Sequence, residues 1–397
     1  MFKDKTILYI VHNYNSFQKD PIEEIAKNFK KVYVLVRYKP ISKIAKYIPI
    51  KWLYKYSDKY VIDLKDLPSN VSVIKTPVWY LPFGVFYKWL GELHFRAVDK
   101  FIKREQIKFD LIHAHFIWSS GYVGIKLKEK YHVPLVITAH GFDVYLLPFK
   151  SRDWEERTKF ILRNADIILP VSHANRESLQ KIGIVDSNMM VLENGFNSEI
   201  FHPMNKGKIR KSLGLDEKAP ILVTIGSLEE VKAHKYLIKA VKNLKRKDSN
   251  ICCYIIGAGS LQTQTELLIK ELHLEKNVYL LGHLSHNEVN KWINSCDLFV
   301  MSSLREGLPV SMLEALGCGK PFIGTKVGGI PEIINSEEYG ILVEPMDQKA
   351  LNSAIEIALK KKWDNDKIAN YGKRFTIKSA VNRTLEVYSK LFEKDNY

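Results

Sequence analysis

The chain has 397 residues, of which 46% are hydrophobic and 26% are charged. This length indicates two or three domains, and this composition excludes a disordered or collagen-like protein. The formal net charge of +16 favours an anionic partner, either a phosphorylated ligand, an acidic membrane face or a nucleic acid. No stretch approaches the roughly 18 uninterrupted apolar residues of a spanning helix. Residues 1–15 lack a small-residue cleavage site, so we expect a first strand there and not a signal peptide.

Residues 1–200 alternate short apolar runs with segments of helical period. Runs that are apolar nearly throughout are buried on both faces, which predicts a parallel sheet covered by helices. The alternation is typical of an α/β doubly wound domain. The predicted strands are 6–12, 31–37, 71–77, 110–116, 134–140, 165–172 and 189–194.

The same pattern restarts after a polar segment at 197–220, which we interpret as a linker between two Rossmann-like domains of similar size. The last segment, 375–394, is predicted to form a helix with one apolar stripe. Such a stripe must pack against another element of the protein. The stripe is Ile377, Val381, Leu385, Tyr388 and Phe392. The strands predicted after the linker are 220–226, 251–259, 278–284, 296–303, 321–326 and 340–345.

Two compositional features bear on location. The four cysteines form no C-x-x-C pair and lie in or beside apolar runs, which favours buried thiols in a reducing compartment over a zinc site or disulfides. The segment 37–60 holds seven basic side chains, one acidic one and six aromatic ones. It is either ordinary solvated surface or a contact with an anionic membrane, to which the apolar tract 77–86 would add an anchor. The cysteines are Cys252, Cys253, Cys296 and Cys318.

Open α/β sheets bind ligands at the carboxyl ends of their strands, so residues that follow strands are candidates for the site. In the second domain, Gly226 and Lys232 follow the strand 220–226. We expect Lys232 at the start of a helix over 232–247, where a lysine can neutralise a diphosphate. Gly257 and Gly259 form a lone G-x-G that would let the chain approach a nucleotide closely.

A pair of glutamates gives the strongest signal in the second domain. Glu306 precedes Gly307 and Leu308, and a helix is predicted to open at Pro309 and to carry Glu314. Two carboxylates that flank a helix N-terminus suit a phosphorylated polyol, because carboxylates accept from sugar hydroxyls and backbone amides donate to anionic oxygens.

The first domain places histidines at the ends of two strands, in HAHF (113–116) and TAHGFDVY (138–145). His140 is interpreted as a residue that faces the ligand. His113, His115 and His140 are not interpreted as a metal trio, because we expect the two strand histidines to point to opposite faces and no acidic partner accompanies them. Asp143 is a weak candidate for a nucleophile.

These stretches together resemble the retaining glycosyltransferases of family 4, which have the GT-B fold. The resemblance covers nearly the whole chain, and its most specific part is the paired-glutamate block 306–334. It implies two Rossmann-like domains that face a cleft, with the C-terminal helix crossing back to the first domain. The implied domains are 1–198 with 376–397 for the acceptor, and 199–375 for the donor.

The resemblance also implies roles for the candidate residues. A nucleotide-diphospho-sugar, such as a UDP- or GDP-sugar, would bind mainly to the second domain, with no metal and no cofactor. Glu314 would hold the ribose, Glu306 and the amides near Gly307 and Leu308 the sugar, and Lys232 the diphosphate, and His140 would contact the sugar or its phosphate. The donor side would also include Gly226, Ser227, Gly257 and Gly259, and the acceptor side Asn13, His115, Asp143 and Asn194.

The sequence departs from the family pattern in two places, one on the donor side and one on the acceptor side. Ser227 stands where the family usually has an arginine, so one cation for the diphosphate is missing. The glycine pair after the first strand is also absent, since residues 11–21 read VHNYNSFQKDP.

The acceptor implied by the resemblance is a saccharide or a lipid-linked compound. We expect a cytoplasmic enzyme of polysaccharide or glycoconjugate synthesis, peripheral on the membrane. The alternatives are a nucleotide-sugar epimerase or phosphorylase of the same fold and, more remotely, a basic nucleic-acid-binding protein.

Overall fold

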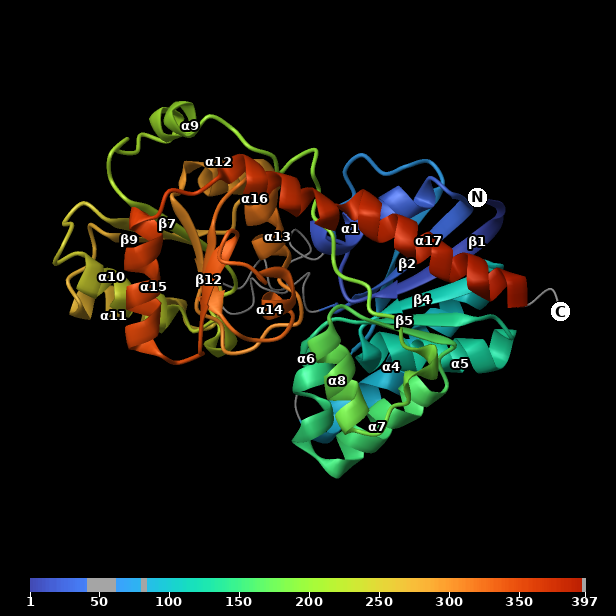
Figure 1. The fold of residues 1–397 in the computed structure, drawn as a ribbon. Coiled ribbons are helices and arrows are strands. Elements are labelled where there is room, and N and C mark those ends of the chain that lie inside the picture. Colours follow the sequence, from blue (N-terminus) through green and yellow to red (C-terminus); the bar gives the residue numbers. More distant parts are fainter. Residues whose placement is uncertain (41–61, 80–83, 395–397) are drawn as a thin grey trace. The chain divides into compact units, whose positions relative to one another are not determined.

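The computed structural model describes residues 1–40, 62–79 and 84–394, the last range without the side chains of 84–86 and 394. The chain forms two compact units, one of Met1–Glu193 with Ile377–Tyr397 and one of Asn194–Thr376 (Figure 1). In each unit helices cover both faces of a sheet. The two Rossmann-like α/β units expected from the sequence are therefore confirmed.

The sheet of the first unit is entirely parallel, and each strand contributes residues to the cores on both faces, although the edge strand β3 is only partly buried. Alternate residues of one strand serve different cores, since Leu8 and Ile10 face one layer of helices and Ile7 and Val11 face the other. The strands are β1 (Phe2–Val11), β2 (Phe29–Tyr38), β3 (Val71–Pro77), β4 (Leu111–His115), β5 (Leu135–Ala139) and β6 (Ile167–Pro170).

The strand order of this sheet is β3-β2-β1-β4-β5-β6. This order reverses between β1 and β4, and such a switch point leaves a crevice at the carboxyl ends of the two strands. The helices of the unit are α1 (Ser16–Ala26), α4 (Gly84–Arg104), α5 (Tyr122–Tyr131), α6 (Phe142–Tyr145), α7 (Arg152–Arg163), α8 (His173–Lys181) and α17 (Ile377–Lys394).

The second unit repeats this topology. Its strand order, β12-β11-β10-β7-β8-β9, places its own switch point between β7 and β10. The strands are β7 (Ile221–Ile225), β8 (Cys252–Ile256), β9 (Val278–Gly282), β10 (Leu298–Met301), β11 (Phe322–Thr325) and β12 (Gly340–Val343). The helices are α9 (Lys206–Ser212), α10 (His234–Leu244), α11 (Gln262–Glu271), α12 (His286–Ser295), α13 (Val310–Gly317), α14 (Ile330–Ile333), α15 (Gln348–Lys360) and α16 (Asn365–Gly372).

Two local predictions are wrong. Residues 189–194 form no strand, because Met189 makes only an isolated bridge with Ile168. The expected linker 197–220 contains the helix α9, whose Arg210 is 2% exposed and donates to the carbonyls of Ser295 and Ala219. The polar composition concealed this helix because it buries only Ile209 and Arg210, so it carries no apolar stripe of helical period.

The division between the units falls at Asn194, so residues 194–198 lie in the second unit and not in the first. The reason is local packing. Phe196 donates its backbone N–H to Phe375 O at 3.0 Å, and a Cβ on Gly317 would lie 2.3 Å from its ring. Phe196 is thus part of the second unit's core.

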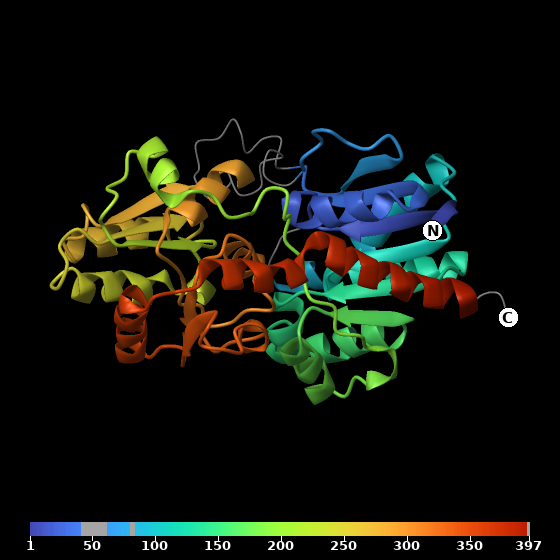
Figure 2. The ribbon, with the colours of Figure 1, turned by 45° about the horizontal axis from the view of Figure 1, so that its top comes forward.

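The C-terminal helix α17 packs on the first unit, as the resemblance implied. Figure 2 shows it along the sheet, where its apolar stripe enters a core with residues of β1, β2 and α1. The hydroxyl of Tyr388 lies 2.9 Å from the hydroxyl of Tyr9 and 2.6 Å from Nδ1 of His113. Arg383 of the helix pairs with Glu193, the last residue of the unit's first segment.

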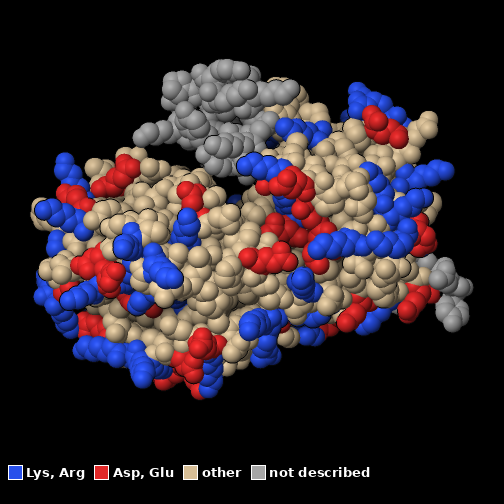
Figure 3. Space-filling model, turned by 90° about the horizontal axis from the view of Figure 1, so that it is seen from above, with Lys and Arg blue, Asp and Glu red and all other residues tan. Residues whose placement is uncertain are grey.

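Charge and thiols complete the description. On the face drawn in Figure 3, basic side chains are interspersed with acidic ones. Cys253, Cys296 and Cys318 are buried, whereas Cys252 is partly exposed, and all four are free thiols. Of the helices in the described ranges, none is long and apolar enough to cross a bilayer.

Replacing Tyr388 with Phe tests the buried hydrogen bonds of α17. The change leaves Tyr9 and His113 each without one partner, so we expect a loss of about 1–3 kcal/mol in the free energy of unfolding. Urea denaturation gives this value. The control is Tyr279→Phe, which removes an exposed hydroxyl that donates to Lys276 O and should change stability by less than about 0.5 kcal/mol. Equal losses in both variants would contradict the role of Tyr388.

Candidate functional site

An ion pair lies at the switch point of the second unit. Lys232, in the loop after β7, donates from Nζ to Oε1 of Glu306, in the loop after β10, at 2.6 Å. The side chains are only 21% and 9% exposed, so water screens the pair weakly. The sequence therefore located both residues correctly at one sheet edge. Lys232 does not begin the helix, however, because it ends a 3₁₀ turn, Glu230–Lys232, and α10 starts at His234.

Hydrogen bonds fix the two loops against each other. Ser303 Oγ donates to the same Oε1 of Glu306 at 2.6 Å, so this oxygen is held from two sides. Leu304 N donates to Val231 O at 2.7 Å, and Ser302 Oγ donates to Ala233 O at 3.0 Å. The glutamate is thus positioned before any ligand arrives.

Glycines allow the loops to approach this closely. A Cβ on Gly328, where φ is +54°, would lie 2.0 Å from Glu306 O. A Cβ on Gly257 would lie 2.1 Å from Gly226 O, and one on Gly259 would lie 2.4 Å from Leu228 O. The G-x-G therefore allows close contact with the loop after β7, and its expected close approach to a nucleotide stays a prediction. Gly226 leaves space for the side chain of Lys232. A Cβ on Gly226 would lie 3.3 Å from Cδ of Lys232.

The helix α13 carries the second glutamate. Pro309 is its N-cap, Val310 its first residue, and Glu314 lies inside it with 7% exposure. Asn194 Nδ2 donates to Leu308 O at 2.8 Å, so this side chain, which we had assigned to the acceptor side, supports the loop between the two glutamates. Gly307 and Leu308 are buried in that loop.

In the first unit, strand β4 and the residues that directly follow β1 and β5 bring four histidines together, His12, His113, His115 and His140. His115 Nδ1 lies 3.0 Å from His140 Nε2, and the rings of His113 and His115 stack with centroids 4.6 Å apart. The expectation that His113 and His115 point to opposite faces is wrong, because residues two apart in a strand share a face. Both nitrogens of His113 are engaged, with Tyr388 and with Thr138 Oγ1 at 2.7 Å.

Several polar atoms at this edge are buried without a partner in the described structure. They are His12 Nε2, Asn13 Oδ1, Gln18 Nε2 and Oε1, and His140 Nδ1. His12 stacks on Phe116 with ring centroids 4.7 Å apart. Buried polar atoms in native proteins nearly always meet a partner, so a cluster of them indicates a place for water or for a hydroxyl-bearing ligand.

Asp143 has a positioning role. Its Oδ1 accepts from Gly141 N at 2.9 Å and its Oδ2 from Ile117 N at 2.8 Å, so it ties the loop after β5 to the loop after β4. Burial raises its pKa, against the opposing effect of these amides. With both oxygens engaged it is poorly placed as a nucleophile. No group of three or more potential metal ligands is found among the described residues.

Comparisons with known proteins agree on one family. Residues 205–375 match the family described as glycosyl transferases group 1, and residues 57–200 match glycosyltransferase family 4. A putative teichuronic acid biosynthesis glycosyltransferase of Bacillus subtilis, TuaC, is 30% identical over 77% of this chain and 76% of its own length. The chain belongs to glycosyltransferase family 4. It is an enzyme that transfers a sugar from a nucleotide sugar.

The chain is also similar to a further relative, and two solved structures share its fold. A D-inositol 3-phosphate glycosyltransferase of Corynebacterium glutamicum is 27% identical over 65% of this chain and 66% of its own. A sucrose-phosphate synthase of Thermosynechococcus elongatus has the same fold, with a TM-score of 0.78, 20% identity and coverage of 98% and 100%. Anabaena HepE in complex with UDP gives a TM-score of 0.73 at 18% identity, with coverage of 97% and 100%.

Sequence reasoning missed three site residues in this glycosyltransferase. Ser303 and Gly328 contact Glu306, and both stand in the 302–334 block from which only other residues were selected. His12 directly follows β1, and its place after a strand at a switch point was the available signal.

The buried histidines predict a loss of stability in mild acid. Burial lowers the pKa of His115 to about 4 and holds those of His12, His113 and His140 well below 6.5. The unfolded chain binds these protons near pH 6.5 and the folded chain does not, so stability is full above pH 6.5 and falls as the pH drops toward 4. We expect a loss of about 1 kcal/mol per buried imidazole between pH 7.5 and 5.5.

Urea denaturation at both pH values measures this loss. His115→Gln should make it smaller, whereas His202→Gln, at an exposed position of the second unit, should leave it unchanged. A loss that is the same in His115→Gln as in the wild type would show that His115 does not contribute.

Proposed function

We propose that the second unit binds a nucleotide-diphospho-sugar with the residues gathered around Glu306. Lys232 would neutralise the diphosphate, Glu306 and the amides of Gly307 and Leu308 would hold the sugar, and Glu314 would hold the ribose. The observation that carries this proposal is the 2.6 Å ion pair of Lys232 and Glu306 at the switch point. The pair holds a cation where a leaving diphosphate would need one.

The proposed reaction breaks the bond between the anomeric carbon and the diphosphate oxygen and forms a bond to an acceptor oxygen. Negative charge develops on the departing diphosphate, and a fixed ammonium stabilises that charge at the transition state. Lys232 is preorganised for this task by Glu306. The acceptor hydroxyl gives its proton to the departing diphosphate as the new bond forms, so that the products are the glycoside and the free nucleotide.

The acceptor is proposed to be a saccharide or a lipid-linked saccharide that binds to the first unit. The unpartnered atoms of His12, Asn13 and His140 support a ligand rich in hydroxyls, because neutral imidazoles both donate and accept. TuaC is named for teichuronic acid biosynthesis, which supports a role in the synthesis of a surface polysaccharide or glycoconjugate.

An assay with purified enzyme tests the function. UDP- and GDP-sugars are supplied with and without an oligosaccharide or polyprenyl-linked acceptor, and free nucleotide is measured. A transferase releases nucleotide only with acceptor. Conversion of the donor sugar alone would indicate an epimerase, and phosphate-dependent release from a glycan would indicate a phosphorylase. HepE was solved with UDP-glucose, so UDP-glucose is the first donor to test.

Lys232→Ala should lower turnover by at least about a hundredfold, as expected when a transition-state charge loses its partner. The control is Lys235→Ala, which removes a lysine three residues away that pairs with the exposed Glu230. Ser227→Arg, at an exposed position, should tighten UDP binding because it restores a cation. Turnover and calorimetric UDP affinity measure these effects. Normal turnover in Lys232→Ala would contradict the assignment.

We also infer that the first unit contacts an anionic membrane. Most of the basic segment 37–60 lies outside the described residues, but α4 gives independent support. Its exposed stripe begins with Trp89 and Leu93, 65% and 36% exposed, and continues with Arg96 and Lys100. Aromatic side chains favour the headgroup layer, and basic side chains are attracted to anionic lipid.

Flotation with liposomes of increasing anionic lipid content tests this contact. Binding should rise with anionic lipid, fall with salt, and drop at least about fivefold in Trp89→Ser/Leu93→Ser, because the apolar contact is lost. The control is Phe160→Ser, which removes an exposed aromatic side chain from α7. Absence of flotation at low salt on every liposome would refute the contact.

A further inference from the structure

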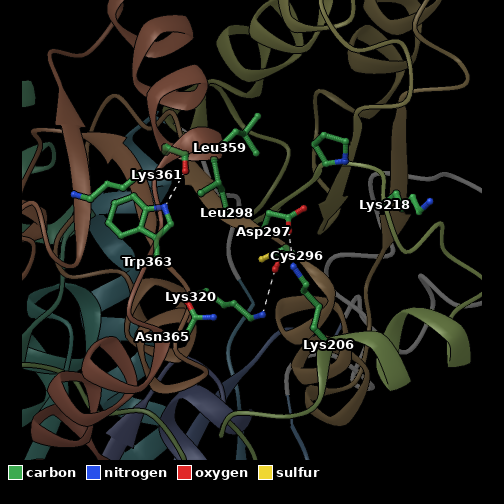
Figure 4. A pocket seen from close by; sticks show the side chains of 12 residues that line it. Lys206, Lys218, Cys296, Asp297, Leu298, Lys320, Leu359, Lys361, Trp363 and Asn365 are labelled. Carbon is green, nitrogen blue, oxygen red and sulfur yellow. Dashed lines mark hydrogen bonds and ion pairs between the residues drawn. The ribbon is translucent and has the colours of Figure 1, made fainter.

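A cavity lies in the second unit, at the opposite edge of the sheet from Glu306. It has a volume of about 340 Å³ and opens at the amino ends of β7, β10 and β11 (Figure 4). Pro220, Asp297 and Lys320 come just before these strands. The cavity is lined by Lys206, Lys218, Pro220, Cys296, Asp297, Leu298, Lys320, Ala358, Leu359, Lys361, Trp363 and Asn365.

The lining carries an excess of positive charge. It contains four lysines and a single carboxylate, Asp297. That carboxylate is already used, because its Oδ2 accepts from Arg210 Nη2 at 2.7 Å and its Oδ1 from Lys206 Nζ at 2.8 Å. Within the described ranges, Lys320 has no carboxylate within 4.0 Å of Nζ.

Lys320 is the unusual member of this set. It is 5% exposed, and its Nζ donates to Asn294 O at 2.8 Å and to Cys296 O at 3.2 Å. These carbonyls satisfy two of the three N–H groups but carry no counter-charge, and a buried ammonium without one is costly. Burial accordingly lowers the pKa of Lys320.

The geometry directs two ammonium groups at one space. In Figure 4 the side chains of Lys320 and Lys206 extend toward the same region beside Cys296. Trp363 lies on another side, held by a bond from Nε1 to Ala358 O at 2.8 Å and covered by Lys361 at 4.3 Å from its ring. Leu298 and Leu359 add apolar wall. A ligand there meets cations at one end and apolar surface at the other.

We propose that this cavity binds a small phosphate ester, whose phosphate lies between Lys206 and Lys320. Lysine is a common phosphate ligand, because its compact charge suits a dianion. The volume is near the lower limit of small-molecule sites, which fits a molecule of sugar-phosphate size. This site is separate from the donor site, because it lies at the amino ends of the strands.

Calorimetry with inorganic phosphate and with glucose 6-phosphate tests the proposal on the full chain. Lys206→Ala should weaken both affinities at least about tenfold, because half of the cationic pair is lost. The matched control is Lys208→Ala, an exposed lysine of the same helix that does not line the cavity. It should change affinity less than about twofold.

Lys232→Ala distinguishes the cavity from the proposed donor site around Glu306. Phosphate affinity should survive this change if phosphate binds in the cavity between Lys206 and Lys320. Lys320→Met provides another probe, which removes the charge at similar volume and should abolish binding while the protein stays folded. Three results would each overturn the proposal. They are unchanged affinity in Lys206→Ala, loss of phosphate binding in Lys232→Ala only, and no binding up to about 10 mM of either probe.

Discussion

The ion pair between Lys232 and Glu306 exists because β7 and β10 are neighbours in a parallel sheet. The two residues are far apart in sequence, and only the crossover topology brings their loops to one edge. Everything else at the edge depends on keeping these loops in contact. Ser303 orients the carboxylate, and Gly328 lets a third loop press against Glu306. The fold and the contacts between the loops therefore position the ion pair without any ligand.

Much of this arrangement could be predicted from the sequence. Strand–helix alternation gave both sheets, and the rule that ligands bind at carboxyl ends selected Lys232, Glu306 and Glu314 before their distances were known. The terminal helix followed from its stripe, but its docking on the first unit came from family resemblance. Spacing along one helix does not specify what lies opposite, and Tyr388 finds His113 only in three dimensions.

The errors have physical causes. The helix α9 was missed because it buries a single apolar residue, Ile209, beside a charged one, Arg210, which bonds to carbonyls. His113 and His115 stack on one face, contrary to the expectation of opposite faces, because side chains two residues apart in a strand point to the same side. The contact of Gly257 and Gly259 with the loop after β7 was not foreseen, because it depends on the backbone of that neighbouring loop. Contacts between loops cannot be read from either loop alone.

The two edges of the second unit's sheet each hold a largely buried lysine, but only the lysine at the carboxyl edge is paired with a carboxylate. At the carboxyl edge, the ammonium of Lys232 already has a carboxylate partner, so the diphosphate that we propose to bind there would share that cation with Glu306. Such sharing would limit how tightly the free enzyme holds the leaving group, which suits a cation that should act more strongly in the transition state than in the ground state. At the amino edge, Lys320 Nζ donates to two carbonyls and, within the described ranges, meets no carboxylate at 4.0 Å or less, whereas Lys206 is paired with Asp297. The phosphate ester proposed to bind there would gain the full charge of Lys320 but would share that of Lys206 with Asp297.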